Sequence, residues 1–171
     1  MTAVTSVRAS GAMSVVEFDD GTSFRCTRDF ARRSQLSRGQ EIDDVFVARL
    51  QESASDDLAL AEAQRLNQRR RYSRNEISHR LREAQIASAA VERALEELER
   101  RGELNDRDVA LRLASKGLRQ LLTRDSTLTE REFQIVQARR LMMRGFGAGA
   151  ASDACRRAWQ DACPDTSQEV R

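Results

Sequence analysis

The sequence has few residues that stiffen a chain or fill a large core. It contains one proline, Pro164, and only 5% of its 171 residues are aromatic. Alanine, leucine, arginine and glutamate are abundant instead, and 33% of the residues are charged. This composition is typical of a helical protein. We therefore expect a mainly α fold whose cores are built from leucine, valine, isoleucine and alanine.

Long hydrophobic runs are also missing. No stretch approaches the roughly 18 apolar residues of a membrane helix, and residues 1–13 lack the features of a signal peptide. The three cysteines, Cys26, Cys155 and Cys163, are an odd number, unlike a secreted disulfide framework. On one helix, Cys155 and Cys163 would lie roughly 12 Å apart, too far for a disulfide. We expect a cytoplasmic monomer with reduced thiols and no membrane partner.

Signatures of catalysis and of cofactor binding are absent as well. His79 is the only histidine and no Cys-x-x-Cys pair occurs, so a zinc site would need long-range assembly. There is no phosphate-binding loop of the G-x-x-x-x-G-K-[ST] type, and the glycines at 145–149 follow no predicted strand. We expect no enzyme activity, no metal and no cofactor. His79 is expected in a structural or surface role and Trp159 in a core.

The first fifty residues differ from the rest in their sequence pattern. Residues 15–18 and 22–26 are β-prone and flank a turn at Gly21, which tolerates the positive φ of a tight hairpin turn. Two short helices are expected next, at 29–34 and 43–51. The small polar residues 53–57 then predict a linker. We expect an N-terminal β-hairpin and helix element over 1–53.

Capping signals divide the rest into helices. The first helix is expected over Leu58–Arg69, and Ser73-Arg74-Asn75-Glu76 is a capping box that opens a second. Ser88 is expected to cap a third, which Gly102 ends in a left-handed conformation. The sequence therefore predicts a three-helix module over 54–104.

The same succession occurs again further along. Asn105-Asp106 is an N-cap pair, Thr129-Glu130-Arg131-Glu132 repeats the capping box, and Gly145-Phe146-Gly147 interrupts the helix that follows. A last helix is expected to end at Pro164. The sequence predicts tandem three-helix modules, a helical repeat array, with the second module at 105–164 and a flexible tail at 165–171.

Three stretches at matching spacings carry a resemblance to a known family. Arg71–Ile77, followed by Leu81, resembles a first-module signature, and Leu98–Asp106 is similar to the exit from the third helix of that module. Leu141–Phe146 resembles a C-terminal Arg-Gly-Phe turn. In this order, over about 13–163, they resemble the RecX family of regulatory proteins.

The resemblance implies a regulator of RecA recombinase. Such proteins bind along the groove of the RecA–DNA filament and inhibit its recombinase, ATPase and co-protease activities, in DNA repair, recombination and the SOS response. Two departures stand out. Most family members have three helical modules, whereas we find two, and Gln85 replaces the family's glycine after the second helix. A shorter array would span less of the groove.

Charge alternates along the helices although the net charge is only +2. Residues 65–82 contain seven arginines and one acid, 87–108 contain four arginines and seven acids, and 139–157 contain five arginines and one acid. Such a pattern suits a partner whose surface is itself mixed, such as a protein filament that carries DNA. The alternative is that neighbouring helices pair their opposite charges and simply keep the array soluble.

Three consecutive arginines, Arg69–Arg71, cannot all face one acidic helix, so this cluster most strongly indicates an anionic partner. The residues that we expect to contact the RecA filament and its single-stranded DNA are Arg69, Arg70, Arg71, Arg74, Arg80, Arg139, Arg140 and Arg144. Two other functions stay open: a helical module that binds DNA directly and acts without RecA, and an adaptor for a different protein.

Overall fold

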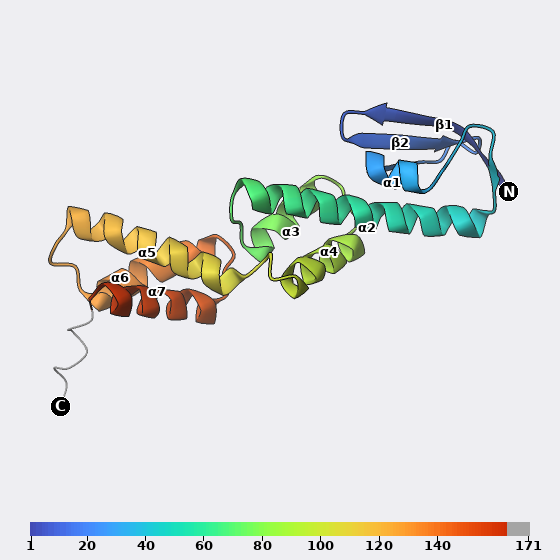
Figure 1. The fold of residues 1–171 in the computed structure, drawn as a ribbon. Coiled ribbons are helices and arrows are strands. Elements are labelled where there is room, and N and C mark those ends of the chain that lie inside the picture. Colours follow the sequence, from blue (N-terminus) through green and yellow to red (C-terminus); the bar gives the residue numbers. More distant parts are fainter. Residues whose placement is uncertain (164–171) are drawn as a thin grey trace.

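The described part of the chain, residues 1–163, forms a row of three units in this computed structural model. A small β-sheet lies at one end, a first helical group follows, and a second helical group lies at the other end (Figure 1). Each unit has its own cluster of buried apolar side chains. The expected mainly α fold with a small N-terminal β element is confirmed.

The N-terminal unit is a four-stranded antiparallel sheet with strand order β3-β2-β1-β4. The predicted hairpin is confirmed as β2 and β3, with Gly21 at φ +82°. The sequence did not predict β1, which pairs with the other side of β2. The elements of this unit are β1 (Thr2–Ser10), β2 (Met13–Phe18), β3 (Ser23–Thr27), α1 (Arg28–Arg33) and β4 (Glu41–Ile42).

The long helix α2 (Asp44–Arg69) joins the first unit to the second. The predicted linker at 53–57 is wrong, because these residues are helical. Ala54 is completely buried in the N-terminal core, and Leu58 is buried in the next core. Burial on both sides of the stretch keeps it helical, since tertiary packing outweighs the weak helix preference of serine and aspartate. The change of core therefore falls inside one continuous helix.

The second unit consists of the C-terminal half of α2 with α3 (Arg74–Glu83) and α4 (Ser88–Arg100). The capping box of Ser73 and Glu76 is confirmed, as is the positive φ of Gly102, +70°. Ser88 is not the cap: Ala87 occupies that position and no side chain caps the helix. The residue at the preceding turn, Gln85, has φ +61°.

The third unit packs α5 (Asp106–Arg124), α6 (Glu130–Met143) and α7 (Ala148–Ala162) around one core. The Asn105 side chain caps α5, and Thr129 and Glu132 form the predicted capping box of α6. Trp159 lies in the core as expected, with its ring centroid 5.9 Å from that of Phe133. The predicted stop at Pro164 and the predicted tail lie outside the described residues.

Candidate functional site: two arginine surfaces

The C-terminal end of α2 presents three consecutive arginines. Arg69 is the last helical residue, Arg70 is the C-cap in an extended conformation, and Arg71 follows. All three are exposed, and no ion pair joins them to a carboxylate within residues 1–163. They line an open hollow together with Asn67, Gln68, Gly102 and Glu103. This cluster can accept an external anion without first releasing an internal one.

Tyr72 brings a fourth arginine to this cluster. Its half-buried ring packs against the core of the second unit. The guanidinium carbon of Arg70 lies 5.4 Å from the ring centroid, and that of Arg80, in the last turn of α3, lies 4.7 Å from it. Cation–π contacts hold the two guanidinium groups in place, while their N–H groups stay available to phosphate or carboxylate oxygens. We call Arg69, Arg70, Arg71 and Arg80 the module-one arginine surface.

Arg74, in contrast, is engaged within the protein. Its guanidinium group contacts Glu92 at 2.7 Å and Glu99 at 2.9 Å, both on α4. Its backbone N–H donates to Asp106 Oδ1 at 2.8 Å. The side chain is only 28% exposed. The positive charge of Arg74, which we expected to contact a partner, is thus already paired within the protein.

Arg144 is engaged in the same way. Its guanidinium group donates to both carboxylate oxygens of Glu76, at 2.9 to 3.1 Å. The two residues lie 68 positions apart in the sequence and come from different helical units. Arg144 therefore joins the two units, and its positive charge is already paired within the protein.

The other two predicted arginines of the third unit, Arg139 and Arg140, are exposed on α6. Neither forms an ion pair with a carboxylate of the described chain. Arg140 also lines a hollow between α5 and α6, together with Lys116, the only lysine of the protein. We call Arg139, Arg140 and Lys116 the module-two arginine surface. The sequence did not single out Lys116, because its proximity to Arg140 arises only when α5 packs on α6.

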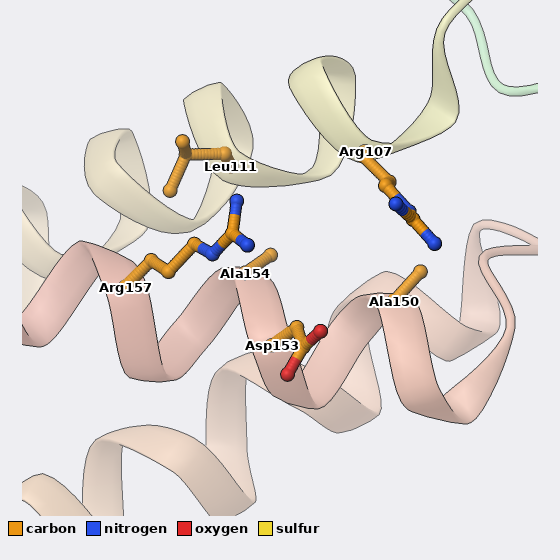
Figure 2. Close-up of a pocket in the computed structure, with 6 residues that line it drawn as sticks. All are labelled: Arg107, Leu111, Ala150, Asp153, Ala154 and Arg157. Atoms are coloured by element: carbon orange, nitrogen blue, oxygen red, sulfur yellow. The ribbon is translucent and has the colours of Figure 1, made fainter.

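A narrow cleft between α5 and α7 carries two further arginines (Figure 2). The guanidinium group of Arg157 lies between Leu111 and Ala154, and Arg107 points toward Ala150 (Figure 2). The nearby Asp153 is paired with Arg156 at 2.6 Å. The cleft encloses about 90 Å³, too little for a nucleotide or a comparable ligand. Arg107 and Arg157 add positive charge here, but the cleft is no small-molecule site.

The candidates for metal binding and for nucleophilic chemistry lie apart. His79 is exposed on α3, with Nε2 3.2 Å from Glu83. Among residues 1–163, no group of three histidine, cysteine or acidic side chains is arranged to hold a metal ion. Cys26 and Cys155 are buried thiols, and burial raises the pKa of Cys155 to about 11. None of the described helices has the length and apolarity to cross a membrane.

Comparison with known proteins gives a likeness of fold. Neither a family model nor a curated protein sequence matches this chain. A solved structure described as "Crystal structure of regulatory protein RecX" is similar, with a TM-score of 0.56 and 15% sequence identity. The match covers 92% of this chain and 74% of that one. The chain thus shares the fold of a RecX regulatory protein over most of its length.

Proposed function

We propose that this protein is a RecX-like regulator that binds the RecA–DNA filament and inhibits the recombinase and ATPase activities of RecA. The observation that carries the proposal is the cluster Arg69–Arg71, which is exposed and has no ion pair in the described chain. It lies on an elongated helical array whose fold is similar to that of a RecX protein.

The mixed charge of the array supports a mixed partner. The module-one arginine surface lies beside α4. On this helix Glu97 forms ion pairs with Arg100 and Arg101, and Glu96 is exposed. A partner with both phosphates and charged protein side chains complements such a surface better than bare DNA does. In a filament groove the array would contact neighbouring protomers. It would then favour the inter-protomer geometry that it binds best, because a ligand shifts an equilibrium by its differential affinity.

The test measures RecA-dependent ATP turnover on single-stranded DNA, with filament light scattering in parallel. We expect the wild-type protein to lower both signals, and the Arg69→Glu/Arg70→Glu/Arg71→Glu variant to lose this effect. Unchanged turnover at a stoichiometric excess of the wild-type protein rejects the proposal. The matched control, Arg93→Glu/Arg100→Glu/Arg156→Glu, makes the same change in charge at exposed arginines that are paired within the protein.

A second candidate function is DNA binding without RecA. The specific observation in its favour is the stacking of Arg70 and Arg80 on Tyr72, which places cations beside an aromatic ring as in single-strand binding sites. Affinity for naked single-stranded DNA would then fall as the salt concentration rises. The slope of log affinity against log salt concentration would be about −0.7 for each phosphate contact. Absent binding to naked DNA alongside binding to the filament favours the first function. If the protein captures a different protein when RecA and DNA are both absent, it acts as an adaptor for that protein.

A further inference from the structure

The N-terminus of α3 is the place where the two helical units meet. Ser73 Oγ donates a hydrogen bond to the backbone oxygen of Arg144 at 3.0 Å. The side-chain amide of Asn75 donates to the backbone oxygen of Gly145 at 2.5 Å. These carbonyls belong to the C-terminal end of α6, where a helix has no internal donors for them. The partially positive N-terminus of one helix thus faces the partially negative C-terminus of the other.

A partly buried ion pair reinforces this contact. The side chains of Arg144 and Glu76 are 25% and 22% exposed, and the guanidinium group reaches both oxygens of the carboxylate. Charge-assisted, bidentate pairs of this kind fix geometry more strongly than single hydrogen bonds do. Glu76 also accepts from the backbone N–H of Ser73, so the cap of α3 and the contact between the units share one carboxylate.

The close approach depends on a glycine. Gly145 has φ +85°, and a Cβ atom at this position would lie 2.8 Å from the Cβ of Asn75. Any other residue would therefore strain the backbone and push the two units apart. The turn between α6 and α7 is thus shaped to fit against α3.

Few other contacts hold the two units together. Their apolar cores are separate: one extends to Leu104, and the other begins at Val109. Units without a large hydrophobic interface are expected to move relative to one another. The orientation of the third unit on the second therefore depends on the polar contacts at α3, including the bond from the Arg74 backbone to Asp106.

We propose that Ser73, Asn75 and Glu76 on one side, and Arg144 and Gly145 on the other, form a clamp that makes the two helical units one rigid body. The clamp holds the module-one and module-two arginine surfaces at a fixed separation and orientation. An anionic partner that touches both surfaces then binds without first ordering the array, which favours tight binding. The rigidity is independent of the proposed function, whereas its effect on filament binding rests on it.

The experiment measures a distance between the units. Spin labels are placed at the exposed positions Ala89 on α4 and Thr123 on α5, as Ala89→Cys/Thr123→Cys with Cys163→Ser. The native Cys26 and Cys155 are buried and stay unlabelled. We expect a single narrow distance distribution. Adding Asn75→Ala/Arg144→Gln removes the Asn75 hydrogen bond and the Arg144–Glu76 ion pair of the clamp, and should broaden the distribution about twofold.

The control is Arg156→Gln, which removes the same charge from an arginine whose partner, Asp153, lies on the same helix. It should leave the distribution narrow. Arg144→Lys with Asn75 intact keeps the positive charge and should give an intermediate width. Helical circular dichroism shows whether each variant is folded. A clamp variant that is folded and as narrow as the wild type overturns the proposal.

A second measurement separates the clamp from the proposed function. Affinity for a RecA–DNA filament should fall about tenfold in the clamp variant if both units engage the filament. A wild-type protein that does not bind the filament rejects the proposed function, while the distance measurement still decides the clamp. A broadened distribution with undiminished filament affinity overturns the role of rigidity in binding.

Discussion

Neutralising the module-one arginine surface should change how binding responds to salt. Arg69, Arg70 and Arg71 are exposed and form no ion pair within residues 1–163, so each is available for one phosphate. Each phosphate contact to single-stranded DNA contributes about −0.7 to the slope of log affinity against log salt concentration. The variant Arg69→Ala/Arg70→Ala/Arg71→Ala should therefore have a slope that is shallower by about 2.

The expected size of the effect follows from this difference in slope. Between about 50 and 200 mM salt, the wild-type affinity should fall roughly 20-fold more than that of the variant. The assay is fluorescence anisotropy of labelled DNA in a RecA filament locked with a non-hydrolysable ATP analogue, titrated with protein at four salt concentrations. The control variant Arg93→Ala/Arg100→Ala/Arg156→Ala loses as many charges from arginines that already have carboxylate partners.

An equal slope for the wild type and the Arg69–Arg71 variant would refute the reasoning, because the three guanidinium groups would then displace no counterions from the filament. A control variant with the same loss of slope would refute it as well. In that case net charge, and not the position of the unpaired arginines, would determine the salt dependence.

Three further predictions concern stability, each measured by urea unfolding. Gln85 has φ +61°, so Gln85→Gly should stabilise the protein by about 1 kcal/mol. A Cβ at Gly117 would lie 2.5 Å from the Gln137 amide, so Gly117→Ala should destabilise by about 1 to 2 kcal/mol, but should stabilise in a Gln137→Ala background. Burial raises the pKa of Asp106 above 3.8. The protonated carboxyl group therefore stabilises the fold at low pH, and this stabilisation is lost as pH rises through the folded-state pKa. Asp106→Asn should remove this loss, and an equally steep pH dependence in that variant would contradict the assignment.

Local signals in the sequence predicted the ends of helices well. The capping boxes at Ser73 and Thr129 and the left-handed Gly102 are all present. Each depends on residues within four positions, so spacing alone is sufficient to recognise it. The expected division into modules at 54–104 and 105–164 was based on the same signals.

Burial by distant residues explains what the sequence did not predict. The stretch 53–57 is polar and looks like a linker, yet Ala54 packs under the sheet and keeps α2 continuous. Ser88 is a good cap by type, but after the turn at Gln85 the N-cap is Ala87 and Ser88 is the first residue of α4. At 53–57, packing between residues that are distant in the sequence thus overrides a local preference.

Contacts between distant residues also limit what the sequence shows of the candidate site. Arginine clusters are visible in the sequence, but their internal partners are not: Arg144 pairs with Glu76 over 68 positions, and Arg74 pairs with Glu99 on another helix. A difference in burial separates the two kinds of arginine. The side chains of Arg74 and Arg144 are 28% and 25% exposed, whereas Arg69–Arg71 belong to the exposed class of residues.

Two of the three stretches that resemble the RecX family, Arg71–Ile77 and Leu141–Phe146, lie against each other at the clamp. Their residues cap α3, turn the chain after α6 and join the units, so this part of the resemblance encodes the geometry of the array. The residues that would touch a partner, by contrast, are mostly exposed arginines outside these stretches. The clamp residues and the arginine surfaces can therefore vary independently, which is why only the clamp variant should broaden the distance distribution and only the Arg69–Arg71 variant should flatten the salt dependence of binding.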